Sequence, residues 1–104
     1  MIHIFLANGF EDIEALTPLD VLRRAGLDVQ LVSISSGLEV RSSHGVRVVA
    51  DATLDSIDLS DSEAMIIPEE CLEHQTYVAT WRYAKLFKPK MLQNVWFVLF
   101  VLAL

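Results

Sequence analysis

Residues 2–26 read IHIFLANGFEDIEALTPLDVLRRAG, and this stretch decides the fold class of the chain. It opens with a short run rich in β-branched and aromatic side chains, residues 2–6, which ends at the turn-forming residues 7–9. A run of this kind before a glycine turn is typical of a buried parallel strand. From Glu11 onward apolar residues recur every three to four positions, which predicts an amphipathic helix. The stretch therefore predicts a strand followed by a helix.

The ends and the middle of that helix carry further signals. Acidic residues between positions 11 and 14 suit its N-terminus, and Arg23 and Arg24 suit its C-terminus, because each charge complements the helix dipole. Gly26 is a natural C-terminal cap. Pro18 cannot donate a backbone hydrogen bond, so we expect either a kink or a later start. The predicted buried face consists of Ile13, Leu16, Leu19 and Leu22.

Downstream segments extend the pattern. Residues 29–34 predict a second strand, and the strand-helix-strand order calls for a parallel sheet with a right-handed crossover. Residues 38–41 and 46–50 flank the turn SSHG at 42–45, which predicts an edge hairpin.

The loops that follow the buried strands are expected to form a site. Residues 51–62 are polar and turn-rich, with Leu54, Ile57 and Leu59 as the apolar side chains that hold them to the sheet, and residues 64–67 form another strand candidate. Ligands of an open parallel sheet bind outside the carboxyl ends of its strands. The loops that follow positions 6 and 67 should therefore lie together.

The composition changes sharply at Pro68. Residues 1–68 hold 11 acidic residues against four arginines, a net charge of −7, and all four glycines. Residues 69–104 hold three acidic and four basic residues, a net charge of +1, with seven aromatic residues and no Gly, Ser, Asp or Ile. The whole chain, 104 residues with 53% hydrophobic residues and a net charge of −6, allows one small domain and argues against disorder and general nucleic-acid binding.

Glu14 is the most informative candidate for chemistry, because it falls at the start of the helix that follows the first strand. Two interpretations are open. It is either a solvated carboxylate of the first helical turn, or a carboxyl group that shares a proton with a nearby nucleophile. Glu11 and Asp12 are expected to be surface acids that complement the helix dipole.

The histidines and the cysteine are weaker candidates for a catalytic or metal-binding role than Glu14. We expect His44 to be a solvated turn residue and His3 to be a partly buried, hydrogen-bonded strand residue. No second ligand falls at metal-binding spacing around either histidine, so no metal and no cofactor are assigned. Cys71 is the single cysteine, which excludes an internal disulfide, and its acidic neighbours Glu69, Glu70 and Glu73 work against a reactive thiolate.

Four motifs follow one another in order: FLANGFEDIEA at 5–15, DVLRRAG at 20–26, SSHG at 42–45 and MIIP at 65–68. On these motifs, residues 1–68 resemble the N-terminal part of the DJ-one (ThiJ/PfpI) superfamily. The resemblance implies an α/β fold, a flavodoxin-like three-layer sandwich with a parallel sheet, here truncated. It also implies a homodimer.

The resemblance further implies a cysteine nucleophile at a strand-to-helix elbow, partnered by a glutamate that matches Glu14. Family activities include glyoxalase or protein deglycase chemistry on small reactive carbonyl compounds, redox sensing, chaperone action and, in some branches, peptidase activity; some members carry a thiazole monophosphate biosynthesis label. In this chain Glu69 and Glu70 stand where the family has Gly-Gly, and the nucleophile elbow is absent. We therefore expect an inactive family fragment.

A reading-frame hypothesis explains residues 69–104. Read one base earlier, the codons for residues 68–73 can encode PGGMPG, and those for residues 95–103 can encode CLVCAICAG, which contains the missing elbow. Two family hallmarks in one shifted frame favour an out-of-frame tail. The alternative is a genuine divergent tail, whose apolar run at 95–104 is shorter than the ~20 residues that span a bilayer.

The alternative to an inactive enzyme fragment is a non-enzymatic function. The chain would then be an interaction protein or a tail-anchored membrane-surface protein, which associates with another chain or a membrane surface through an exposed sheet edge and the apolar tail. A thiol enzyme built on Cys71 is a third interpretation. No basic segment precedes the first strand, so we expect a cytoplasmic protein without a membrane span.

Overall fold

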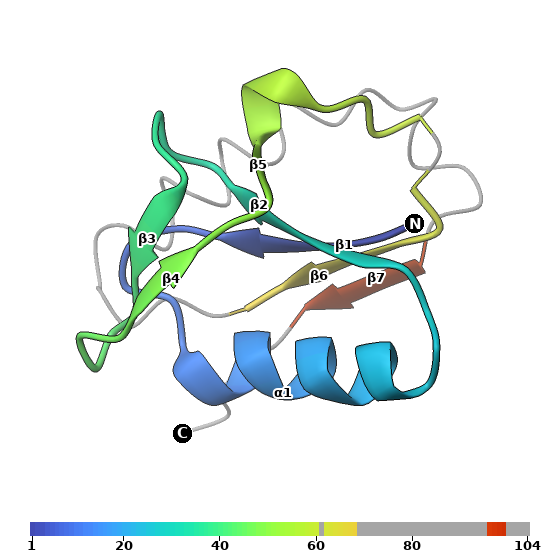
Figure 1. Ribbon diagram of the computed structural model, residues 1–104, viewed down its shortest axis with the longest axis horizontal. Helices are drawn as coiled ribbons and strands as arrows, with labels where there is room; N and C mark the ends of the chain where they lie inside the picture. The colour runs from blue at the N-terminus through green and yellow to red at the C-terminus, as the bar shows by residue number, and fades with distance from the viewer. Residues whose placement is uncertain (61, 69–95, 100–104) are drawn as a thin grey trace.

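Strand β1 (Ile2–Leu6) lies at the centre of a five-stranded sheet of order β5-β2-β1-β6-β7. It pairs with β2 (Val29–Ser33) on one side and with β6 (Ala64–Ile67) on the other. The short β5 (Ala52–Thr53) follows β2, and β7 (Trp96–Leu99) follows β6. All four pairings are parallel, so the predicted α/β class with a parallel sheet is confirmed (Figure 1).

The computed structural model describes residues 1–60, 62–68 and 96–99. The three strands predicted to be buried all form, and β1 has the predicted bounds. The two edge strands were not predicted. Cys71 and the expected helical part of the tail lie outside the described residues, and the domain boundary at Pro68 stays a prediction.

Alternate side chains of β1 point to opposite faces of the sheet. Ile2, Ile4 and Leu6 belong to the core cluster that packs under helix α1, whereas Phe5 belongs to a second cluster on the other face. That second cluster is covered by the segment that begins with the 3-10 turn η1 (Leu54–Ser56), on the side of the sheet away from α1 (Figure 1). As predicted, its apolar side chains pack onto the sheet: Leu54, Ile57 and Leu59.

Helix α1 (Asp12–Arg24) runs through Pro18, so the expectation of a later start is wrong. It ends at Arg24, and Gly26 follows the C-cap residue Ala25 with a φ of +80°, as expected of a glycine that terminates a helix. There the N–H of Gly26 donates to Arg23 O (3.0 Å) and the N–H of Leu27 donates to Leu22 O (3.1 Å), which satisfies two of the last carbonyl groups.

The buried face of α1 differs from the predicted one at its first position. Ile13 is 71% exposed, whereas Ala15 is fully buried and Leu19 and Leu22 pack against the same core cluster. Ala15, Leu19 and Leu22 follow the i, i+4, i+7 spacing of one helical face, and Ile13 lies about 200° around the helix from Ala15. A small alanine at the contact lets the helix approach the sheet closely.

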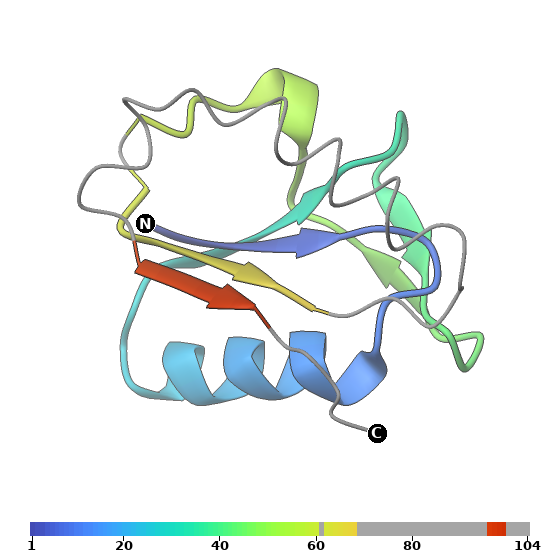
Figure 2. The same cartoon turned by 180° about the vertical axis from the view of Figure 1, so that it is seen from behind.

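The predicted hairpin forms a separate two-stranded antiparallel sheet of β3 (Glu39–Arg41) and β4 (Arg47–Val49). It lies beside the carboxyl end of β1 and the first turn of α1 (Figure 1). Figure 2 shows from behind that β7 flanks β6 at the opposite edge of the main sheet from β5. In the described part of the chain, no helix is long and apolar enough to cross a bilayer.

Candidate functional site

The candidate site lies where β1 and β6 end side by side. Their register pairs Ile4 with Ile66, so the loops that leave both strands start from the same edge of the sheet, as expected. The loop after β1 leads directly into α1, and the β3–β4 hairpin lies against it (Figure 1). The loop after β6 is described only at Pro68, which is buried.

The loop between β1 and α1 is tied to the hairpin by backbone hydrogen bonds. The N–H of Gly9 donates to Arg41 O (2.8 Å), and the N–H of Arg41 donates to Asn8 Oδ1 (3.1 Å). Gly9 has a φ of +91°, a conformation that glycine adopts without the steric cost of a side chain. Phe10 follows and is completely buried, which fixes where the helix begins.

The turn of the hairpin lies against the same loop. Phe10 and Ser42 form an isolated parallel bridge, and the N–H of Ser43 donates to Phe10 O (2.9 Å). Ser42 is buried, and its Oγ accepts the N–H of Val46 (3.0 Å). The turn at 42–45 is therefore held rigidly beside the first residue of α1.

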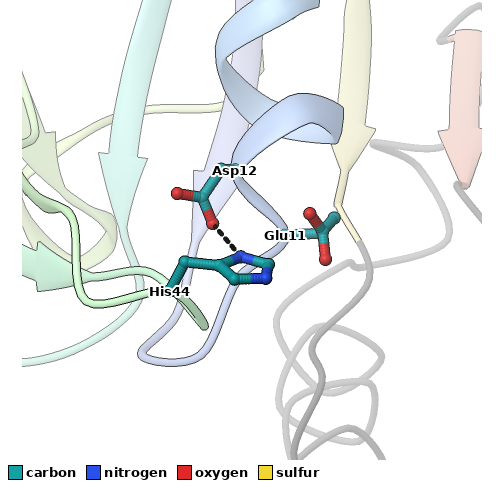
Figure 3. A group of neighbouring side chains, drawn as sticks. All are labelled: Glu11, Asp12 and His44. Atoms are coloured by element: carbon teal, nitrogen blue, oxygen red, sulfur yellow. Dashed lines mark hydrogen bonds and ion pairs between the residues drawn. The ribbon is translucent and has the colours of Figure 1, made fainter.

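Asp12 is the residue on which these contacts converge. Ser42 Oγ donates to Asp12 Oδ2 (2.9 Å), and His44 Nδ1 lies 3.1 Å from Asp12 Oδ1 (Figure 3). Partial burial tends to raise the pKa of Asp12, but the hydrogen bonds from His44 and Ser42 outweigh it and hold that pKa below its ordinary value. Asp12 lies in the first turn of α1, where its charge suits the helix dipole as expected, and its side chain also joins α1 to the hairpin.

His44 is exposed, as predicted, yet it is more than a solvated turn residue. Its hydrogen bond to Asp12 raises its pKa above the ordinary value, and the charges of Asp12 and Glu11 raise it further. An imidazolium at this position donates to the carboxylate, so the pair behaves as an ion pair across the junction of hairpin and helix.

Glu11, Asp12 and His44 offer three ligand atoms that all lie within 4.8 Å of one another (Figure 3). Sequence spacing gave no metal site, since 32 positions separate Asp12 from His44. The fold brings them together because the hairpin turns back over the start of α1. The sequence contains both parts of this cluster, in the polar motifs FED at 10–12 and SSHG at 42–45. A single sequence does not show that these two motifs lie together in the fold.

Glu14 lies in the first turn of α1 and is only 9% exposed. Of the two interpretations of this carboxyl group, the solvated one does not fit this burial. It lies on the helix face next to Ala15, which points to the sheet, whereas Glu11 and Asp12 lie at the rim.

His3 is a hydrogen-bonded strand residue as predicted, but it is fully buried and not partly buried. It is 3% exposed, and its Nδ1 lies 2.8 Å from Ser62 Oγ. Burial lowers its pKa, and the positive N-terminus lowers it further. His3 lies near the amino end of β1, so it is not part of the candidate site.

Comparison with known proteins adds a family likeness to this geometry. The model of the DJ-1/PfpI family matches residues 1–94, past Pro68. YraA of Bacillus subtilis is 34% identical over 67 residues, which cover 64% of this chain and 40% of that protein. Protein DJ-1 homolog B of Arabidopsis thaliana is 38% identical over 63 residues, 61% of this chain and 14% of that protein.

Solved structures agree on the fold. A cysteine-to-alanine mutant of a DJ-1 superfamily protein from Salmonella typhimurium superposes with a TM-score of 0.64 at 34% identity, covering 67% of this chain and 38% of that one. Schizosaccharomyces pombe DJ-1 superposes with a TM-score of 0.66 at 21% identity, and the superposed region covers 94% of this chain and 56% of that one. At this identity the likeness is one of fold alone. The chain thus spans less than two thirds of the length of each of these proteins.

Proposed function

Because the chain belongs to the DJ-1/PfpI family, we propose that Glu14 is the carboxyl partner of a cysteine nucleophile in chemistry on small reactive carbonyl compounds, of the glyoxalase or protein deglycase kind. The observation that supports this most directly is the burial of Glu14 in the first turn of α1, the helix that follows the loop at the carboxyl end of β1. A charged group buried at a loop-lined strand end is a typical candidate for a tuned proton donor or acceptor.

A glutamate in this position can serve a thiol in a simple way. A carboxyl group out of bulk water can hydrogen-bond to a thiolate when protonated, and it can take a proton from a carbonyl adduct when ionised. The loop after β6 starts beside the loop that leads to α1, so a nucleophile supplied from that side of the sheet would reach the same place.

The polypeptide with this sequence is proposed to be inactive. Its single cysteine, Cys71, follows Glu69 and Glu70, and no nucleophile elbow is present. We propose that residues 69–104 are a family sequence translated out of frame. The alignments to YraA and DJ-1 homolog B are 67 and 63 residues long, about the length of residues 1–68, which supports a change of reading frame near Pro68. The family match extends to residue 94, which favours the alternative of a genuine divergent tail.

The first test is the coding DNA around Pro68. Read one base back, it should encode PGGMPG directly after the MII motif and the AICA elbow near the end. Absence of either string contradicts the frameshift.

The second test is turnover of methylglyoxal, followed by substrate loss. The chain as it stands is expected to show none. The chain re-expressed in the shifted frame after Pro68 is expected to be active, and Glu14→Gln should reduce that activity by about 10²- to 10⁴-fold. Glu39→Gln, an exposed acid on the hairpin, is the matched control and should leave the activity unchanged. Glu14-dependent turnover by the original chain would contradict the proposed inactivity.

Self-association is a second proposal, favoured by apolar side chains at the surface. Among the residues that the structure describes, the most exposed of these lie on α1 and on β4, namely Ile13, Val21 and Val49, at 71%, 56% and 68%. We propose that these faces meet in a homodimer. Light scattering should give a dimer mass that Val21→Lys and Val49→Lys convert to a monomer mass; binding to lipid vesicles instead would favour the membrane-surface alternative.

A further inference from the structure

We propose that Glu11, Asp12 and His44 bind one divalent transition-metal cation of the Zn²⁺ class at the junction of α1 and the β3–β4 hairpin. The proposal does not rest on the role of Glu14, because none of the three ligands is that residue. It stands on the approach of three donor atoms from two separate elements, within 4.8 Å of one another.

The distances fit a coordination sphere. Zinc bonds to nitrogen and oxygen are about 2.0–2.2 Å, so any two ligand atoms of a tetrahedral site lie about 3.3–3.6 Å apart. Asp12 Oδ1 and His44 Nδ1 are already 3.1 Å apart, close to this separation, and the cation would replace the proton of their hydrogen bond. The ligand atom of Glu11 lies within 4.8 Å of the other two, and Figure 3 shows Glu11 on the side of the imidazole away from Asp12, so its carboxylate has to move closer to complete the set.

The donor types select the class of metal. An imidazole nitrogen with carboxylate oxygens suits Zn²⁺, Cu²⁺ or Ni²⁺, whereas Ca²⁺ and Mg²⁺ prefer all-oxygen sites. Two carboxylates also supply the negative charge that a divalent ion needs. Three protein ligands leave a coordination position for water or for another oxygen ligand, as in open zinc sites.

The surroundings hold the ligands in place. Ser42 Oγ donates to the Asp12 oxygen that does not contact His44, an outer contact of the kind that orients metal-binding carboxylates. The same hydroxyl accepts the N–H groups of His44 (3.3 Å) and Val46 (3.0 Å), so it fixes the turn that carries the imidazole. Buried Phe10 fixes the backbone before Glu11. The metal therefore has to order the Glu11 side chain, whereas Asp12 and the turn are already held.

The test is calorimetric titration of the whole chain with ZnCl₂ at pH 7, with MgCl₂ and CaCl₂ as comparison ions. We expect one Zn²⁺ per chain and no heat from Mg²⁺ or Ca²⁺. His44→Ala should weaken Zn²⁺ binding by at least about tenfold, and Asp12→Asn and Glu11→Gln should weaken it in the same direction. Glu39→Gln, a hairpin acid outside the cluster, should have no effect.

A second measurement does not depend on any variant. In imidazole NMR spectra of the original chain, the His44 resonances should shift or broaden at the first equivalent of Zn²⁺, ahead of those of His3 and His74. Circular dichroism of His44→Ala should stay native, because that side chain is 69% exposed. The proposal is overturned if Zn²⁺ does not bind below 1 mM, or if Cys71→Ser or His74→Gln abolishes binding while His44→Ala leaves it unchanged.

Discussion

His3 Nδ1 and Ser62 Oγ meet at 2.8 Å across 59 positions of the sequence, and both side chains are buried. Ser62 Oγ also lies 3.2 Å from the carbonyl oxygen of Ala64, at the start of β6. The pair therefore joins the first strand to the segment that enters the strand beside it. Its burial keeps the imidazole neutral over a wider pH range than in the unfolded chain.

The first prediction is a loss of stability in mild acid. The pKa of His3 is lowered from 6.5 in the folded protein, so the unfolded chain binds a proton at a higher pH than the folded one does. The contribution is complete above pH 6.5 and is lost as the pH falls from there through the lowered pKa. Urea unfolding between pH 7.5 and 5 should show this decline, and His3→Asn should flatten it. His44→Gln is the contrasting variant, because its pKa is raised and its contribution has the opposite sign.

The second prediction compares two adjacent serines in the hairpin turn. Ser42→Ala removes a buried hydroxyl that donates to Asp12 and accepts the N–H of Val46, so it should cost about 1–3 kcal/mol of unfolding free energy. Ser43→Ala removes only contacts of 3.1 and 3.5 Å near the surface and should stay within about 0.5 kcal/mol. Equal effects in chemical denaturation would show that Ser42 does not hold the turn.

The third prediction compares two glycine substitutions and tests whether the positive φ of Gly26 stabilises the C-terminal end of α1. Gly26 has a φ of +80° and an added Cβ would meet nothing within 4 Å, so Gly26→Ala should destabilise by about 1–2 kcal/mol through backbone strain alone. Gly37 also has open space around it but no positive φ. Gly37→Ala should therefore be neutral or stabilise by about 0.4–1 kcal/mol. A thermal melt that moves both variants in the same direction contradicts this.

The fourth prediction concerns Asp51, which links β2 to the last turn of α1. Its Oδ2 accepts the N–H of Leu31 (2.8 Å) and contacts Arg23 Nη2 (3.2 Å). Asp51→Asn keeps an acceptor for Leu31 and loses a half-exposed ion pair, which should cost about 0–1 kcal/mol. Asp51→Ala loses both contacts and should cost about 1–2 kcal/mol more. If the two variants unfold at the same denaturant concentration, the backbone contact contributes nothing.

Sequence patterns predicted the strands of the sheet that are packed from both sides. β1 was predicted to the residue because all five of its side chains are buried and turn residues follow at once. The hairpin was predicted from the glycine-containing turn at 42–45, whose Gly45 has a φ of +80°. The two-residue β5 was missed, since a strand of that length has no period of its own.

What the sequence could not predict depends on tertiary contacts. Ile13 fits an apolar stripe as well as Ala15 does, and only the approach of α1 to the sheet decides which one is buried. The meeting of Asp12 and His44 depends on the loop at Gly9, which ties the start of α1 to the hairpin. Glu14 was placed correctly at the start of the helix, but its burial follows from the same docking.

The place of β1 at the centre of the sheet has a consequence for synthesis. Ile2 pairs with Ala64, which is synthesised 62 residues later. At about 5–20 residues per second, this strand, apolar except for His3, waits about 3–12 seconds for β6. During that interval the edge of β1 that later pairs with β6 is open to strands from other nascent chains, because β2 covers only the opposite edge. Expression at high ribosome density should therefore favour inclusion bodies, and holdase chaperones that cover the first residues should relieve this.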